Sequence, residues 1–140
     1  MAASTPSQEP LKVLIVEDNH DARTTLRMLL TMVYGHVVYE ASDGLRAIQI
    51  VLEQRPDVAL IDLGLPALNG YEVARRIRAQ LTRGEIFLVA LTGYGTDEDR
   101  IRTEEAGFDV HLVKPVESAA LAQILAQVPA LRVVGDADRA

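Results

Sequence analysis

Five polar side chains stand at the ends of short apolar segments, where their types could support chemistry. They are three carboxylates, one hydroxyl and one ammonium group, and they belong to Glu17, Asp18, Asp62, Thr92 and Lys114. Carboxylates that share a pocket repel each other, by roughly 4 kcal/mol for two charges about 4 Å apart at an effective dielectric near 20. Raised pKa values or a bound cation would relieve that repulsion. Oxygen ligands without His or Cys suit a hard cation such as Mg²⁺.

Phosphoryl transfer is the chemistry that this combination of side chains suggests. An aspartate can act as a nucleophile and form an aspartyl phosphate. Mg²⁺, Lys114 and Thr92 would then hold the phosphoryl oxygens and stabilise their charge. Taken singly, each residue has a plainer interpretation as a helix cap, a turn residue or a surface charge. Only their convergence at one place favours a functional site.

The apolar segments predict the strands that would bring these side chains together. They are Leu11–Val16, His36–Glu40, Val58–Ile61, Ile86–Leu91 and Val110–Val113. The first, third and fourth are nearly continuous runs of apolar residues, which is typical of strands buried on both faces. Helical patterns between the strands predict βαβ units and a parallel sheet. We expect an α/β, doubly wound (βα)5 flavodoxin-like fold of strand order 2-1-3-4-5, with all carboxyl ends along one edge.

Apolar residues three and four positions apart predict the helices. The stripes are Leu26, Leu29, Leu30 and Val33; Ala47, Ile48, Val51 and Leu52; Val73, Ile77 and Leu81; and Leu121, Ile124, Leu125 and Val128. Capping side chains predict the helix starts, namely Asn19, Ser42 or Asp43, and Thr96. Glycines predict the helix ends, namely Gly35, Gly84 and Gly107.

The predicted fourth helix differs from the others in its apolar content. Between Asp97 and Ala106, Ile101 is the only large apolar residue. A helix that buries so little apolar surface is held weakly by the rest of a domain. We therefore expect low local stability there, which makes this helix a candidate mobile element.

Length and composition restrict the class of protein. The 140 residues suffice for one domain, and 49% apolar and 24% charged residues are typical of a globular chain. The absence of cysteine excludes thiol catalysis, disulfides and thiolate metal sites. A net charge of −6 argues against a direct nucleic-acid partner. No apolar run is long enough for membrane insertion.

Three regions are expected along the chain. Residues 1–10 are small and polar with two prolines, which is typical of a disordered leader and not of a signal peptide. Residues 11–128 contain all five predicted strands and the helices between them. Residues 129–140 end in polar positions and are interpreted as a C-terminal tail or the remnant of a linker.

Four short motifs, each at the end of a predicted strand, carry a resemblance to a known family. In order they are V-E-D-N, I-D-L-G-L-P-A-L-N-G-Y-E, A-L-T-G and L-V-K-P. Together they resemble the receiver domain of two-component response regulators, the CheY-like phosphoacceptor domain, over about Leu11 to Val128. The stretch from the third to the fourth motif is similar to receivers attached to hybrid sensor histidine kinases. The resemblance implies a phosphorylation-dependent switch of a phosphorelay, and not an enzyme beyond its own phosphorylation and dephosphorylation.

The resemblance implies Asp62 as the phosphoacceptor and Mg²⁺ as the cofactor. Asp18 and Asp62 would bind Mg²⁺ directly, Glu17 through water, and the backbone carbonyl of Gly64 would be a further ligand. Gly64 and Tyr94 would flank the path of attack on the phosphoryl group. Because Tyr94 could shield the bond, we expect slow to moderate self-dephosphorylation.

The remaining motif residues also have implied roles. Thr92 would be the switch hydroxyl, Lys114 would contact the phosphoryl group, and the Lys114–Pro115 bond would be cis. Gly70 would let the loop enter the third helix. His111 stands where most members carry an aromatic switch residue. It is therefore either a rotamer switch coupled to Thr92 or a half-buried strand histidine with a satisfied hydrogen bond.

The resemblance also implies partners and a location. The phosphoryl donor would be a sensor histidine kinase or a histidine phosphotransfer protein in a bacterial cytoplasm. Direct contact with nucleic acid or a membrane is not implied. A dimer through the face formed by the fourth helix, fifth strand and fifth helix is allowed.

Two alternative functions use the same residues. A non-phosphorylated pseudo-receiver that acts as a docking module predicts a damaged set, whereas all five polar side chains are present. A Mg²⁺-dependent phosphatase with an aspartate nucleophile, of the haloacid dehalogenase type, places a second acid two residues after the first. This chain has Gly64 at that position.

Overall fold

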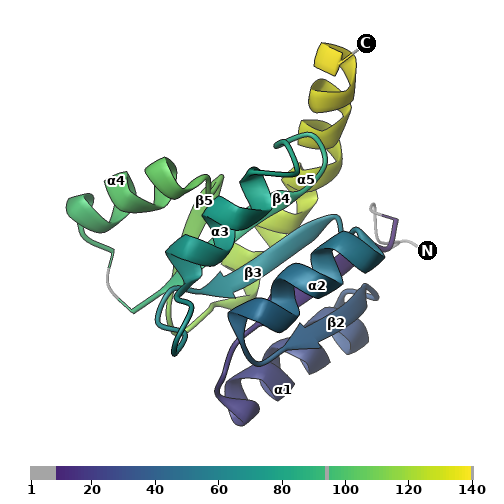
Figure 1. Cartoon of the computed structure of the whole chain (residues 1–140). Coiled ribbons are helices and arrows are strands. Elements are labelled where there is room, and N and C mark those ends of the chain that lie inside the picture. Colours follow the sequence, from purple (N-terminus) through teal and green to yellow (C-terminus); the bar gives the residue numbers. More distant parts are fainter. Residues whose placement is uncertain (1–8, 94, 140) are drawn as a thin grey trace.

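Five parallel strands form a single sheet at the centre of the molecule (Figure 1). The computed structural model describes residues 9–93 and 95–139, with side chains as far as residue 128. The sheet order is β2-β1-β3-β4-β5, which confirms the predicted topology. The strands are β1 (Lys12–Val16), β2 (Val37–Ala41), β3 (Val58–Asp62), β4 (Phe87–Thr92) and β5 (Val110–Val113).

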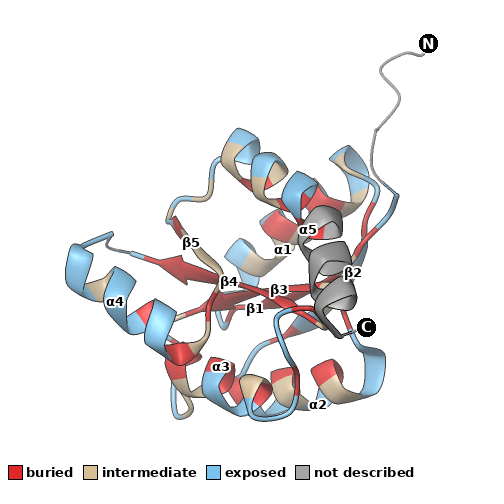
Figure 2. Ribbon diagram, turned by 90° about the horizontal axis from the view of Figure 1, so that it is seen from above, coloured by how far each residue is buried: buried red, intermediate tan, exposed pale blue. Residues whose placement is uncertain are grey.

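Helices cover both faces of the sheet, as right-handed crossovers require. They are α1 (His20–Met28) with the π-helix η1 (Leu29–Val33), α2 (Gly44–Gln54), α3 (Gly70–Arg78), α4 (Asp97–Ala106) and α5 (Ser118–Arg139). Helices α1 and α5 lie on one face and α2 and α3 on the other, with α4 beside β5 (Figure 2). Among the described helices, none is long and apolar enough to cross a bilayer.

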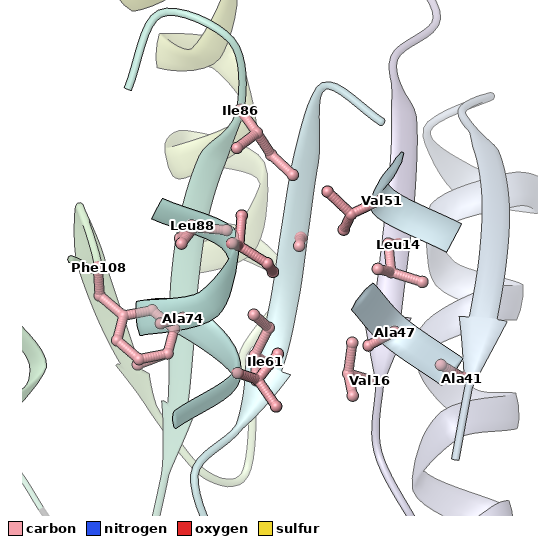
Figure 3. Packing of buried hydrophobic residues seen from close by; sticks show 14 of the residues in the cluster. Leu14, Val16, Ala41, Ala47, Val51, Ile61, Ala74, Ile86, Leu88 and Phe108 are labelled. Atoms are coloured by element: carbon pink, nitrogen blue, oxygen red, sulfur yellow. The ribbon is translucent and has the colours of Figure 1, made fainter. Parts of the chain in front are cut away.

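Two apolar clusters fill the space between the sheet and these helices. One packs against α2 and α3, and Figure 3 shows some of its side chains, which come from the strands and from these helices. The other packs against α1 and α5 and includes Leu26, Leu121 and Leu125. Every residue of β3 and β4 is buried, which confirms that the continuous apolar runs are strands covered on both faces.

Capping side chains begin the helices where the sequence predicts them. The side chains of Asn19, Asp43 and Thr96 each accept a backbone N–H bond in the first turn of α1, α2 and α4. Asp43, and not Ser42, is therefore the cap of α2. Gly107 ends α4 with a φ of +105°, a left-handed conformation that glycine adopts without strain.

Two of the expected helix details are wrong, for identifiable reasons. Val33 is 65% exposed, because η1 contains an i→i+5 bond from the Tyr34 N–H to the Leu29 carbonyl. The additional residue per turn rotates Val33 away from the core. Helix α3 ends at Arg78, well before Gly84, because the chain turns back there around the Arg78 guanidinium.

Helix α4 buries no large apolar side chain, in agreement with its composition. Ile101 is 56% exposed, and the buried side chains of α4 are the small Thr103 and Ala106. Helix α5 continues to Arg139, so the backbone of most of the expected C-terminal tail is helical. Residues 1–8 of the expected leader lie outside the described residues. The division of the chain at residues 10 and 128 stays a prediction.

Candidate functional site

The predicted site residues meet at the carboxyl edge of the sheet. Glu17 and Asp18 follow β1, Asp62 ends β3, Thr92 ends β4 and Lys114 follows β5. These four strands are consecutive neighbours in the sheet. The Lys114 N–H donates to the Thr92 carbonyl at 2.7 Å, which holds the ends of β4 and β5 together. Residues almost one hundred positions apart therefore share one pocket, as the topology predicts.

The three carboxylates form a compact acidic cluster. Oxygen atoms of Glu17, Asp18 and Asp62 all lie within 4.8 Å of one another. Glu17 is 2% exposed and Asp62 8% exposed, while Asp18 faces solvent. Two unit charges at that separation repel by about 3 kcal/mol at an effective dielectric near 20. A positive charge nearby would therefore stabilise the cluster, and the ligand atoms that its three side chains offer are all oxygens.

Lys114 supplies one positive charge to this cluster. Its Nζ donates to Glu17 Oε1 at 2.9 Å and lies 3.2 Å from Asp62 Oδ1. Burial raises the pKa of Glu17, and the Lys114 hydrogen bond offsets this only in part. Burial alone would lower the pKa of Lys114, but the hydrogen bonds and charges of Glu17 and Asp62 outweigh it and raise that pKa. The Lys114–Pro115 bond is cis, as the resemblance implies.

Backbone N–H groups also hold the acidic side chains, a contribution that residue types alone do not reveal. The Asn19 N–H donates to Glu17 Oε2 at 3.1 Å. The Gly64 N–H donates to Asp62 Oδ1 at 3.1 Å. Oδ1 of Asp62 thus contacts both Gly64 and Lys114, while no described residue donates to Oδ2. These two contacts fix one oxygen of the candidate nucleophile in place.

Gly70 keeps the loop after β3 close to the acidic cluster. A Cβ atom at this position would lie 2.5 Å from the Asp62 carbonyl oxygen and 2.8 Å from Leu63 Cα, both impossible contacts. The Gly70 N–H also donates to the Leu63 carbonyl at 3.2 Å. Asn69 then caps α3 by accepting from the Glu72 N–H. Glycine at position 70 therefore lets α3 begin directly against the end of β3.

Thr92 and His111 lie on the same face of the sheet. Ala90 pairs with His111 and Thr92 pairs with Val113 in the parallel ladder of β4 and β5. Side chains two residues apart on a strand share a face, so both point toward the α4 side. His111 is half-buried and lines a cavity of about 210 Å³ beside α4. Tyr94, expected to shield the acyl phosphate, lies outside the described residues.

Comparison with known proteins agrees with the fold and the pocket. The fold and the site define a doubly wound α/β domain with an acidic pocket at the carboxyl edge of its sheet. Residues 13–126 match the family described as the response regulator receiver domain. The chain therefore belongs to the receiver domains of two-component response regulators.

Individual relatives agree with this assignment. The chain is 37% identical over 109 residues to the transcriptional regulatory protein AfsQ1 of Streptomyces coelicolor, covering 78% of this chain and 47% of that protein. It is 34% identical over 122 residues to the response regulator MprA of Mycobacterium sp. strain KMS, covering 87% of this chain and 50% of MprA. The chain thus spans about half the length of these relatives.

Solved structures show the same fold. The receiver domain of the sensor histidine kinase PA1611 from Pseudomonas aeruginosa PAO1 has 35% identity and a TM-score of 0.75, and the match covers 84% of this chain and 95% of that one. That structure has a magnesium ion coordinated in its active site cleft. The chemotaxis response regulator CheY4 of Vibrio cholerae has 28% identity and a TM-score of 0.78, covering 86% and 99% of the two chains.

Proposed function

We propose that this chain is a phosphorylation switch that accepts a phosphoryl group from a phosphohistidine onto Asp62. The observation that carries this function is the clustering of three carboxylates within 4.8 Å around Asp62, with Lys114 in contact. In the transfer, a carboxylate oxygen of Asp62 forms a bond to phosphorus while the P–N bond of the phosphohistidine breaks. The leaving group is the neutral imidazole of the donor once it is protonated.

The acidic cluster fits Mg²⁺ as the resident cation. Glu17, Asp18 and Asp62 place oxygen atoms within 4.8 Å of one another, which is the kind of donor set that a hard cation prefers. Asp18 and Asp62 would bind the ion directly and Glu17 through water, and the Gly64 carbonyl would be a further ligand, as the resemblance implies. Bound Mg²⁺ would neutralise charge on the transferring phosphoryl oxygens. The single ammonium of Lys114 leaves a surplus of two negative charges if all three acids are ionised. A divalent ion matches that surplus.

Thr92 and Lys114 are the residues that would respond to the new group. Conversion of a carboxylate to an acyl phosphate adds negative charge and acceptor oxygens beside Asp62. The Lys114 ammonium, now shared by Glu17 and Asp62, would turn toward the phosphoryl oxygens, and the Thr92 hydroxyl would donate to them. Because His111 shares the sheet face of Thr92, it would change its rotamer in response, and Tyr94 would slow hydrolysis.

The partners follow from the same chemistry. The donor would be a sensor histidine kinase or a histidine phosphotransfer protein in a bacterial cytoplasm. The output would be a population shift that changes the face of α4, β5 and α5, through which a dimer could form. The domain would catalyse only its own phosphorylation and dephosphorylation.

Acetyl phosphate with Mg²⁺ tests the proposal directly. We expect one phosphoryl group per chain, detected as a mass increase, in the wild type and in the control variant Asp21→Asn, which removes the same charge from an exposed position on α1. Asp62→Asn should show none. Phosphorylation of Asp62→Asn equal to the wild type, or none in the wild type, would refute Asp62 as the acceptor.

A further inference from the structure

Helix α4 is held unevenly along its length. Its buried side chains, Thr103 and Ala106, both lie in its second half. Its C-terminal end is fixed, because the Gly107 carbonyl accepts a hydrogen bond from Arg78 Nε at 2.9 Å. The residues of its first turn are exposed or half-buried, and Figure 2 shows the exposed surface of the helix. The position of the first half of α4 therefore depends on contacts made by side chains in the middle of the helix.

Arg102 provides that contact, with an aromatic ring of α3. Its guanidinium carbon lies 4.2 Å from the centroid of the Tyr71 ring. A guanidinium within about 6 Å of an aromatic centroid is attracted by the negative face of the ring. Tyr71 is only 7% exposed, so its ring is held by the core, whereas Arg102 is an exposed residue of α4 whose side chain reaches that ring. The contact joins α4 to α3 and not to the sheet.

Tyr71 is in turn coupled to the acidic cluster through the backbone. It follows Gly70, whose Cα is so close to the end of β3 that a Cβ atom would lie 2.5 Å from the Asp62 carbonyl oxygen. A close-packed contact of this kind transmits displacement, because neither backbone can move toward the other. A shift of the Asp62 backbone would therefore move the first turn of α3, and the Tyr71 ring with it.

We propose that the Arg102–Tyr71 contact is a positioning device that couples helix α4 to Asp62 through the loop between β3 and α3. This inference rests on the proposed function and adds a second route to it, on a different strand from Thr92 and His111. Coupling between two sites is reciprocal. A change in the Arg102–Tyr71 contact must therefore alter the affinity of the acidic pocket for a phosphoryl group.

Hydrogen exchange of the full chain, with and without Mg²⁺ and beryllofluoride as the phosphoryl mimic, tests this coupling. Arg102→Gln and Tyr71→Leu both remove the contact. Arg100→Gln removes the same charge from the same helix, and Tyr71→Phe keeps the ring, so these are the matched controls. We expect α4 to exchange about two- to fivefold faster in the first two variants without beryllofluoride, the range for an exposed cation–π contact. The beryllofluoride concentration at half-saturation should shift by a similar factor.

The control variants distinguish a failure of this coupling from a failure of the proposed function. It is supported if Arg102→Gln and Tyr71→Leu change both quantities while Arg100→Gln and Tyr71→Phe match the wild type. It is overturned if Arg102→Gln behaves as Arg100→Gln, or if α4 exchange changes while the half-saturation concentration stays constant, since that outcome describes a merely structural contact. Absence of any beryllofluoride response in the wild type refutes the proposed function and the coupling together, and is visible before any variant is compared.

Discussion

The two ends of the sheet both bury carboxylates beside cations, but with opposite charge balance. At the amino end, Asp109 accepts from Arg78 Nη2 at 2.7 Å, from Arg83 Nη1 at 2.9 Å and from the Leu88 N–H at 2.8 Å. One carboxylate there has two cationic partners. At the carboxyl end, the cluster of three carboxylates is contacted by the single ammonium of Lys114, which pairs with Glu17 and Asp62.

The difference shows how a structural ion pair is distinguished from a site. Arg78 also donates to the carbonyls of Thr82, Ile86 and Gly107, so its donors and those acceptors are matched locally. A satisfied network of this kind stabilises the fold and requires no ligand. The surplus of anionic charge at the other end favours raised pKa values or a bound cation. Charge balance, and not burial, separates the two.

The largest expected effect comes from disrupting the hydrogen-bond network of Arg78 and Asp109 at the amino end of the sheet. Arg78→Ala removes the less exposed of the two cationic partners of the Asp109 carboxylate, together with the side-chain donor of three carbonyls. It should lower the free energy of unfolding by about 3 kcal/mol. Arg83→Ala removes the exposed partner of the same carboxylate and should change the free energy of unfolding little. Urea denaturation measures both. Equal losses in the two variants would contradict the view of Arg78 as the centre of the network.

Addition of Mg²⁺ should stabilise the chain through the acidic cluster at the carboxyl end of the sheet and not through the network at the amino end. Mg²⁺ at tenfold its dissociation constant should stabilise the wild type by about 1.4 kcal/mol. Asp18→Asn should lose most of this gain, because Asp18 is the exposed member of the cluster and its charge attracts the ion. Thermal unfolding with Mg²⁺ is the measurement. A Ca²⁺-free buffer of matched ionic strength is the control for a general effect of salt. If Mg²⁺ stabilised Asp18→Asn as much as the wild type, Asp18 would not be a ligand of the ion.

Neutralising one carboxylate should have opposite signs at the two ends. Without Mg²⁺, Asp62→Asn relieves repulsion from two acids and loses attraction to one lysine, so it should stabilise the chain by about 1 kcal/mol. Asp109→Asn should destabilise it, because two arginines lose their partner. Denaturation of both variants in EDTA compares them. Destabilisation by both would mean that the carboxyl end is also satisfied.

The smallest expected effect is a pH dependence at the amino end. His36 is buried, and its Nδ1 accepts the Leu11 N–H at 3.0 Å. Burial lowers the pKa of His36, and the nearby charge of Asp57 opposes this only partly. The unfolded chain therefore binds a proton more readily, so stability should fall as pH decreases below the ordinary value of 6.5. His36→Gln should flatten that slope in denaturation between pH 5 and 7, whereas the exposed His20→Gln should not.

The carboxyl edge was predictable from sequence because topology alone assembles it. Once the strands are parallel and ordered, the ends of β3 and β5 lie along the same edge, and Asp62 and Lys114 lie there with them. The hydrogen-bond network of Arg78 at the amino end was not predictable, because the partners of Arg78 are mostly backbone carbonyls, which every residue carries. The π-helix was missed for a similar reason, since residues 29–33 have an ordinary helical stripe. Pattern specifies which residues converge, while backbone hydrogen bonds decide local details such as the bond from the Tyr34 N–H to the Leu29 carbonyl in the π-helix.

The exposed side chain of Ile101 makes this chain well suited to spectroscopic labelling. The chain has no native thiol, so Ile101→Cys would introduce a unique attachment point for a fluorophore or a spin label. At 56% exposure the position accepts a probe without opening the core. It lies one residue from Arg102 on α4 and on a different element from every member of the acidic cluster. A probe there would report motion of the helix without occupying the acidic pocket.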